Sequence, residues 1–164
     1  MIQYKPMGIK KVFNLKSLLT GALFFSLVCN VYAAGTDDVK KNIIEQAKQM
    51  GVEPAIVLSI AKMESGFNQS AKSACGNHIG VFQLSHATAK RMGLDPYKLE
   101  DNIKGGITYY KQMYEKFGSM ELAVAAYNSG PDAIMRNNNT IPKHSQNFVN
   151  RIMSDYKYYK GIGI

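Results

Sequence analysis

Apolar residues recur every three or four positions along most of the chain, the spacing that places side chains on one face of a helix. The first stripe begins at Val39 and stops before Gly51, and the second begins after Pro54. Proline suits the first turn of a helix because its missing N–H has no partner there. Gly66 supplies a stop for this second helix. The pattern therefore predicts two helices in this region.

Four more helices are predicted further along the chain. Serine or aspartate stands at the expected capping position of three of them, at Ser85, Asp101 and Ser119. The last helix carries an apolar stripe that includes Ile152. Residues 78–84 have no helical period and form at most a short extended segment. About six helices without a convincing sheet predict an all-α, or mainly α, domain.

Two adjacent glycines interrupt the long helix that follows Asp101. A glycine in a helix interior costs about 1 kcal/mol relative to alanine, so Gly105 and Gly106 need a compensating role. A helix face without side chains lets another element approach closely. We therefore expect a second helix to pack against these two glycines.

The second helix ends with an acid on its apolar stripe. The stripe that includes Ala61 continues at helical spacing onto Glu64, two residues before Gly66. An acid on a core-facing stripe loses part of its hydration, which raises the pKa of its carboxyl group toward the range of a general acid. Glu64 is therefore a candidate proton donor, and a solvated acid at a frayed helix end is the alternative.

Four polar or small residues could assist such an acid. Gly80 lets backbone approach a ligand, and Gln83 offers an amide that both donates and accepts hydrogen bonds. Tyr127 and Asn128 end a helix at a turn, where side chains can reach a cleft. The alternatives are ordinary ones, in which Gln83 caps a loop and Tyr127 is a core ring with its hydroxyl at the surface.

The length of 164 residues allows one domain with a single core. Residues 1–34 have the features of a secretory signal, because four lysines precede a short apolar run and small residues stand near a plausible cleavage point. Removing them lowers the formal net charge from +8 to +4 and leaves residues 35–164 as the mature domain. We expect a periplasmic or secreted protein, with an uncleaved anchor as the alternative. The remaining basic residues are scattered, so no nucleic-acid partner is expected.

The sequence shows no metal-binding or nucleophilic motif. His78, His86 and His144 lack the spacing and the neighbouring acid that metal sites use, so no metal and no cofactor is predicted. Ser65 lies outside any nucleophile elbow, and no base can be placed beside Cys75. Once the signal is removed, Cys75 is the only cysteine, so no intramolecular disulfide is expected.

Three segments carry a family likeness, in the order AKMESGFN, GVFQLS and AYNSGP. They resemble the signature blocks of the soluble-type lytic transglycosylase (SLT) domain of glycoside hydrolase family 23, which has a lysozyme-like fold. DNIKGGITYY and NFVNRIMSDY resemble further segments of that family, so the likeness spans about Lys41 to Tyr156. One block alone is weak evidence, but three in order are specific.

The resemblance implies which residues form the site. Glu64 matches the family's single catalytic acid/base. The implied substrate-binding residues come from all three blocks: Ser65, Gly80, Phe82, Gln83, Tyr127 and Asn128. Phe82 replaces the family's usual methionine, and the loop before Gln83 is one residue longer than usual. These departures affect the detail of the sugar subsites more than the chemistry.

The resemblance also implies a reaction. In this family the acid protonates the β-1,4 glycosidic oxygen between N-acetylmuramic acid and N-acetylglucosamine, and the muramoyl acetamide stabilises C1. The C6 hydroxyl then gives its proton to Glu64 and attacks C1, which leaves a 1,6-anhydromuramoyl end without using water. An ordinary glycosidase needs a second carboxylate, and no acid lies between Glu64 and Asp95.

The expected protein is thus a monomeric lyase acting on peptidoglycan glycan strands. Two alternatives remain open, a lysozyme-type hydrolase and a non-catalytic glycan-binding accessory. Short exported enzymes of this type resemble those that open the cell wall locally for secretion, conjugation or pilus assembly. Such a complex is therefore a candidate partner, by analogy alone.

Overall fold

The computed structural model of the protein describes residues 35–164, and the signal segment predicted for residues 1–34 lies outside the described residues. The described residues form helices and one two-stranded sheet, which confirms the prediction of a mainly α domain. No described helix is long and apolar enough to cross a membrane.

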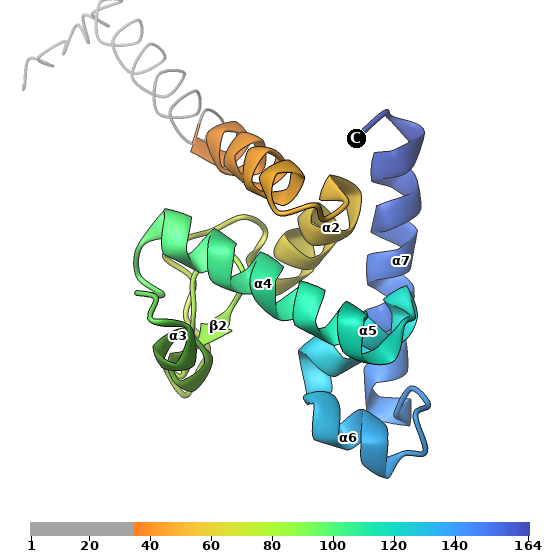
Figure 1. The fold of residues 1–164 in the computed structure, drawn as a ribbon. Coiled ribbons are helices and arrows are strands. Elements are labelled where there is room, and N and C mark those ends of the chain that lie inside the picture. Colours follow the sequence, from red (N-terminus) through yellow and green to blue (C-terminus); the bar gives the residue numbers. More distant parts are fainter. Residues whose placement is uncertain (1–34) are drawn as a thin grey trace, which may run out of the picture. The chain divides into compact units, whose positions relative to one another are not determined.

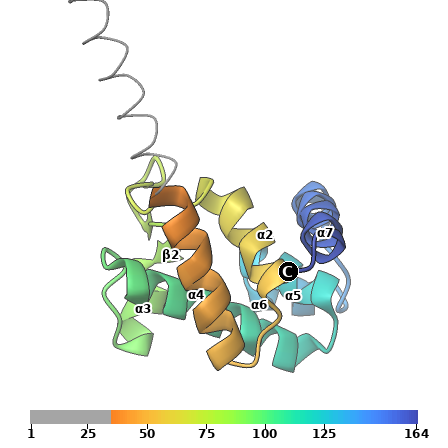
Figure 2. The ribbon, with the colours of Figure 1, turned by 90° about the horizontal axis from the view of Figure 1, so that it is seen from above.

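The second helix of the described chain, α2 (Pro54–Ser65), lies at the centre of the core. It runs between a helix over residues 35–49 and the last helix, α7 (Gln146–Gly161) (Figure 1, Figure 2). Pro54 occupies its first turn, and Gly66 ends it with a left-handed φ of 62°, both as predicted. Every residue from Ala55 to Ala61 is buried, so α2 is a rigid base for the residues at its C-terminal end.

Polar contacts at two levels fix α7 against α2. Lys62 pairs with Asp155 at 2.6 Å. Glu53, which precedes α2, pairs with Lys160 at 2.5 Å and accepts a hydrogen bond from the Tyr156 hydroxyl at 2.8 Å. The hydrogen bond from Lys160 lowers the pKa of the Glu53 carboxyl group. Exposed ion pairs contribute at most about 1 kcal/mol each, so the buried apolar faces hold these helices together.

A small hairpin follows α2. Strand β1 (His78–Ile79) pairs antiparallel with strand β2 (Leu84–Ser85), and residues 80–83 form the turn between them. The turn is closed by a hydrogen bond of 3.1 Å from the Gln83 N–H to the Gly80 carbonyl. This hairpin is the short extended segment that was predicted.

Of the capping residues predicted for the next two helices, one is confirmed and one is wrong. Ser85 caps α3 (His86–Met92) as predicted, because its hydroxyl accepts a hydrogen bond from the first turn at 3.0 Å. Helix α4 (Leu99–Phe117) begins two residues before Asp101, so the predicted cap is wrong. Asp101 lies in the first turn and accepts from the Asp95 N–H at 3.0 Å. An acid stabilises a helix start at either position, so the sequence pattern is the same for both.

The two adjacent glycines of α4 face the hairpin, so the expected contact with another helix is wrong. A Cβ at Gly105 would meet Leu84, and a Cβ at Gly106 would collide with the ring of Phe82. Phe82 is the largest fully buried side chain among the described residues. The face that these glycines leave open is therefore filled by the hairpin turn, which brings residues 80–83 close to α4.

Three short helical elements lie between α4 and α7. Helix α5 (Met120–Ser129) is followed directly by α6 (Pro131–Arg136) and, after a turn, by the 3-10 helix η1 (Lys143–Ser145). The sequence did not predict α6, because a glycine–proline pair such as that at 130–131 is typical of a helix end. The proline instead occupies the first turn of α6, so the pair ends one helix and begins the next.

Candidate active site

Glu64 is the last residue but one of α2, and it lines a cavity of about 280 Å³. The other lining residues come from the loop after α2, the hairpin and α5: Ser73, His78, Gln83, Tyr127 and Asn128. No described residue makes a hydrogen bond or an ion pair with the Glu64 carboxyl group. The group is therefore free to meet a ligand in this cavity.

Burial raises the pKa of the Glu64 carboxyl group from 4.5 to about 7. The cause is desolvation, because the helix end and its neighbours exclude water from most of the group. Among the residues that the structure describes, no basic side chain offsets this effect. The group is thus partly protonated near neutral pH, which is the state that a general acid needs.

The hairpin turn beside Glu64 is held by three helices. From α2, the Ser65 hydroxyl donates to the Val81 carbonyl at 2.8 Å. From α4, the Asn102 side-chain oxygen accepts from the Phe82 N–H at 2.9 Å. From α5, the Tyr127 hydroxyl donates to the Phe82 carbonyl at 2.8 Å. The turn therefore has little freedom to move relative to the helix end that carries the acid.

Tyr127 connects the turn to the acid. Its hydroxyl is buried, and both burial and the nearby charge of Glu64 raise the pKa of the phenol. Its ring makes an edge contact with Tyr109 of α4, with ring centroids 5.2 Å apart. The next residue, Asn128, accepts a hydrogen bond from the Ser145 hydroxyl at 3.2 Å through its side-chain oxygen. Its amide N–H groups have no partner among the described residues and can donate to a ligand.

Gln83 adopts a left-handed φ of 45°, which turns the chain from the hairpin turn into β2. Its side-chain amide donates to the Gly80 carbonyl at 3.0 Å and to the Ala71 carbonyl at 3.3 Å. These two bonds agree with a loop-capping role for the nitrogen. The side-chain oxygen has no partner among the described residues, and Gln83 lines the cavity.

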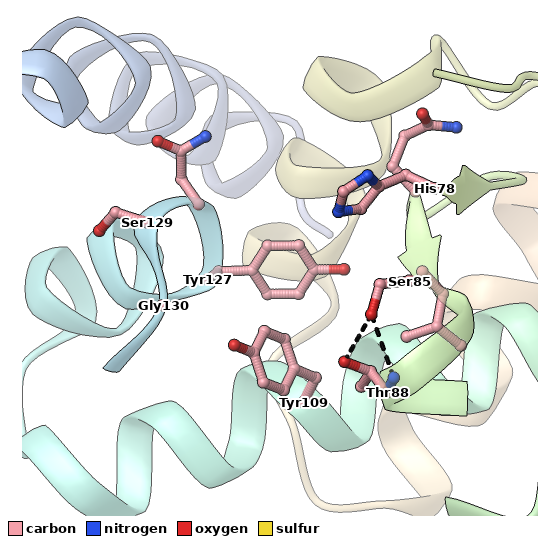
Figure 3. Close-up of a pocket in the computed structure, with 10 residues that line it drawn as sticks. His78, Ser85, Thr88, Tyr109, Tyr127, Ser129 and Gly130 are labelled. Carbon is pink, nitrogen blue, oxygen red and sulfur yellow. Dashed lines mark hydrogen bonds between the residues drawn. The ribbon is translucent and has the colours of Figure 1, made fainter. Parts of the chain in front are cut away.

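A second cavity of about 260 Å³ shares four lining residues with the first: His78, Gln83, Tyr127 and Asn128. It continues between α3 and the end of α5 (Figure 3). Figure 3 shows Tyr127 projecting from α5 toward Ser85 and Thr88 on the opposite side, with the ring of Tyr109, from α4, beside the Tyr127 ring. Together the two cavities form an elongated polar groove with Glu64 in one half, which we call the groove.

The groove brings together four of the predicted site residues, Glu64, Gln83, Tyr127 and Asn128. Ser65, Gly80 and Phe82 are not among its lining residues. Gly80 has a φ of 77° and packs against Asn102 and Gln69. Its backbone approaches these side chains, whereas the sequence suggested an approach to a ligand. Phe82 is fully buried, so its ring meets the core and not the groove.

Sequence reasoning did not assign two residues that shape the site. His78 lines both halves of the groove, but in the sequence it was considered only as a metal ligand and as a partner for Cys75, and neither role was favoured. Asn102 is fully buried and donates to the Ile79 and Pro96 carbonyls at 2.7 and 2.9 Å. No sequence pattern marked Asn102, because a polar residue in a helix usually faces solvent. Among the described residues, no group of three His, Cys, Asp or Glu side chains could hold a metal ion.

A sequence model of the transglycosylase SLT domain matches residues 41–149. This chain belongs to the transglycosylase SLT domain family. The matched range contains every residue that lines the groove. The SLT domain assignment thus agrees with the resemblance that the three sequence blocks indicated.

Several curated proteins are similar to this SLT domain. The transglycosylase of Enterobacteria phage PRD1 is 31% identical over 83 residues, which cover 50% of this chain and 31% of that protein. Membrane-bound lytic murein transglycosylase C of Mannheimia succiniciproducens is 27% identical over 141 residues, covering 71% of this chain and 38% of that protein. The chain spans about a third of the length of these relatives.

Two solved structures share the fold of the SLT domain. An inactive variant of the lytic transglycosylase Slt from Pseudomonas aeruginosa has 22% identity and a TM-score of 0.63, covering 73% of this chain and 23% of that chain. The 70 kDa soluble lytic transglycosylase of Escherichia coli has 23% identity and a TM-score of 0.63, covering 74% and 24%. The predicted lysozyme-like fold is therefore confirmed.

Proposed function

We propose that the protein is a peptidoglycan lytic transglycosylase, a lyase that cleaves the β-1,4 bond between N-acetylmuramic acid and N-acetylglucosamine. One observation carries the proposal. Glu64, with its raised pKa, is the only acid among the described residues that line the groove. Membership of the SLT domain family and the similarity to a lytic murein transglycosylase support the same reaction.

Glu64 acts first as the proton donor. Its protonated carboxyl group gives its proton to the glycosidic oxygen, which leaves as the C4 hydroxyl of N-acetylglucosamine. The muramoyl C1 then carries positive charge. Glycosidases of the usual kind meet this charge with a second carboxylate or with a water that such a carboxylate activates. The described residues that line the groove include no second carboxylate, so in this proposal the substrate's own acetamide oxygen stabilises C1.

Glu64 acts next as the base. The C6 hydroxyl of the same muramoyl residue attacks C1, a new C1–O6 bond forms, and the carboxylate takes the hydroxyl proton. The carboxyl group is protonated again at the end of the cycle. The product is a 1,6-anhydromuramoyl end, and no water is consumed. General acid–base action of this kind contributes about 10²–10⁴-fold to a rate, so positioning must supply much of the remainder.

The neighbours of Glu64 supply that positioning. The free oxygen of the Gln83 amide and the free N–H groups of Asn128 face the same cavity as the acid and can hold sugar hydroxyl and acetamido groups. Tyr127 acts through its hydrogen bond to the Phe82 carbonyl, which fixes the turn beside the acid. Ser65, Gly80 and Phe82 serve as supports of that turn in this proposal.

The site of action follows from the substrate. Peptidoglycan lies outside the cytoplasmic membrane, so we infer that residues 1–34 direct export and that residues 35–164 act as the catalytic domain in the periplasm or outside the cell. Local opening of the wall for a secretion, conjugation or pilus complex is the setting that we infer by analogy. Finding the protein evenly distributed and free of any envelope complex would contradict that setting.

Product analysis tests the proposed function. Purified peptidoglycan is digested with the protein, and the fragments are identified by mass spectrometry. The expected ends are anhydromuramoyl ends, which are one water lighter than reducing ends. Glu64→Gln should lower the cleavage rate by at least about 10²-fold while the variant still binds the glycan.

Two outcomes would replace the proposal. Reducing ends would assign the protein as a lysozyme-type hydrolase. Equal inertness of the wild type and the Glu64→Gln variant, with glycan binding retained by both, would assign it as a binding accessory.

A further inference from the structure

A separate cavity of about 380 Å³ lies at the opposite end of α2 from Glu64, and we call it the tyrosine cavity. Its lining residues come from the start of α2 and the residues before it, from α4 and from the start of α5: Gly51, Val52, Glu53, Ile56, Tyr110, Lys111, Tyr114, Glu115 and Met120. None of them lines the groove. Glu53 immediately precedes α2 and Glu64 lies near its end, so about 16 Å of helix rise separates the two sites.

Tyr110 presents a hydroxyl without a partner to the tyrosine cavity. The residue is only 4% exposed, and its hydroxyl makes no hydrogen bond with a described residue. The oxygen is nevertheless not sealed off from solvent. Tyr110 lines this cavity and neither half of the groove, so the hydroxyl opens into the tyrosine cavity. Because buried hydroxyl groups are usually hydrogen-bonded, this one is suited to a partner that enters the cavity.

The surroundings of this hydroxyl are electronegative. Burial is the main cause that raises the pKa of the Tyr110 phenol, and the neighbouring Tyr114 and Glu53 raise it further. The Glu115 carboxylate also lines the cavity, and it makes no hydrogen bond or ion pair with a described residue. Lys111 is the one base among the lining residues, and its ammonium group already donates to the Met50 carbonyl at 3.0 Å. The cavity therefore favours a ligand with positive charge.

The walls of the tyrosine cavity are apolar and aromatic. Val52 and Ile56 are buried and Met120 is partly buried. The rings of Tyr110 and Tyr114 stack with their centroids 6.3 Å apart and their planes at 25°. Tyr114 is 45% exposed, so its ring also belongs to the outer surface beside the cavity. An arginine side chain matches these walls, because its stem is aliphatic and its planar guanidinium group stacks on aromatic rings and pairs with carboxylates.

We propose that the tyrosine cavity receives an arginine side chain of a partner protein. The stem of the arginine packs against Ile56 and Met120, and the guanidinium group donates to the Glu115 carboxylate and to the Tyr110 hydroxyl oxygen. A protein is the source because the exposed Tyr114 ring extends the contact beyond the cavity, and tyrosine and arginine are enriched where protein interfaces are most tightly bound. A partner bound at this end of α2 leaves the groove open to its substrate.

Binding of a small arginine probe tests the chemistry of the cavity. Nα-acetyl-arginine N-methylamide and its uncharged citrulline analogue are titrated into the protein, and the dissociation constants are obtained from the shifts of backbone amide NMR signals. The arginine probe should shift the signals of residues around the tyrosine cavity and bind at least about fivefold more tightly than the citrulline probe. Shifts confined to other parts of the protein, or equal binding of the two probes, would overturn the proposal.

Single substitutions test the two polar contacts. Glu115→Gln and Tyr110→Phe should each weaken binding of the arginine probe at least about threefold. Glu100→Gln is the control, because Glu100 is an exposed acid of the same helix that lines neither the tyrosine cavity nor the groove, and it should leave probe binding unchanged. Tyr110→Phe should keep the melting temperature of the wild type, since the hydroxyl has no partner among the described residues. Unchanged probe binding in both variants would contradict the proposed contacts.

Cleavage assays separate this proposal from the proposed function. Glu115→Gln and Tyr110→Phe should digest peptidoglycan at the wild-type rate, because both residues lie outside the groove. A wild type that binds the arginine probe but cleaves nothing would refute the proposed function alone.

Crosslinking in cells tests whether the arginine belongs to a protein. Photoreactive p-benzoylphenylalanine replaces Tyr114 at the edge of the cavity, and the adducts are identified by mass spectrometry. The expected adduct is a protein with an arginine in the crosslinked segment, and changing that arginine to glutamine should abolish the adduct, as should Glu115→Gln. The absence of a protein adduct, or an adduct that survives both changes, would overturn the proposal. Spermidine that binds more tightly than the arginine probe would do the same, because it would assign the cavity to a small polyamine.

Discussion

At the scale of single residues, the environment of Glu64 decides what the site can do. An apolar helix stripe that ends in an acid was visible in the sequence, and the structure shows the expected result, a raised pKa caused by burial. The buried Asn102 was not recognised, because a polar residue in a helix usually faces solvent. Its partners are backbone groups of the hairpin turn and the following loop, and only the fold reveals them.

The raised pKa of Glu64 predicts a stability that depends on pH. The folded carboxyl group has a pKa of about 7, above the ordinary value of 4.5, so between these values the folded state binds more protons than the unfolded state. Stability therefore falls as the pH rises through this range, by about 3 kcal/mol in total. Glu64→Gln removes the ionisable group, so the variant should be up to about 3 kcal/mol more stable than wild type at pH 8 and similar at pH 4.

Urea unfolding at both pH values measures the difference. The exposed Glu115→Gln is the control and should stay within about 0.5 kcal/mol of wild type at each pH. A Glu64→Gln variant that is no more stable than wild type at pH 8 would show that the carboxyl group is well solvated.

Tyr127→Phe tests the link between α5 and the hairpin turn. It removes only the hydroxyl that donates to the Phe82 carbonyl at 2.8 Å. The variant should lose about 1–3 kcal/mol of unfolding free energy, because the carbonyl loses its partner. Cleavage should fall by at least about tenfold, since the turn beside Glu64 loses a constraint. Tyr158→Phe makes the same change at an exposed position and should leave both quantities unchanged. Full activity in Tyr127→Phe would exclude a positioning role for this hydroxyl.

At the scale of helices and strands, the sequence predicted helix ends and caps correctly wherever a single residue determines the local backbone conformation. Pro54 and Gly66 bound α2 as expected, and Ser85 caps α3. The glycine–proline pair before α6 was ambiguous, because the same two residues end one helix and open another. The partner of the α4 glycines could not be predicted, since the hairpin reaches them only through the tertiary fold.

Gly106→Ala tests that packing. Alanine is the better helix former by about 1 kcal/mol, so the change would stabilise an α4 with open space at this position. The added Cβ would instead collide with the Phe82 ring, and the variant should be about 1–3 kcal/mol less stable. Gly161→Ala in α7 has no atom in its way and should be neutral or stabilising. Thermal unfolding of both variants measures the contrast, and a stabilised Gly106→Ala would mean that the hairpin does not pack closely on α4.

At the scale of the whole molecule, α2, α4 and α5 converge on one short turn, and the acid sits where they meet. The family and the lysozyme-like fold were predictable from three short blocks in order, because those blocks hold the acid, the turn and the end of α5. Arg136 of α6 and Lys143 of η1 line one hollow. The sequence pattern did not predict this hollow, because it did not predict α6.

Digestion of peptidoglycan in heavy-oxygen water tests most directly whether Glu64 works without a second carboxylate. The C6 hydroxyl attacks C1 in the proposed reaction, so the new muramoyl ends should contain no oxygen from the solvent. Heavy oxygen at C1 of the new ends, found by mass spectrometry, would show that water is the nucleophile and would contradict the proposed function.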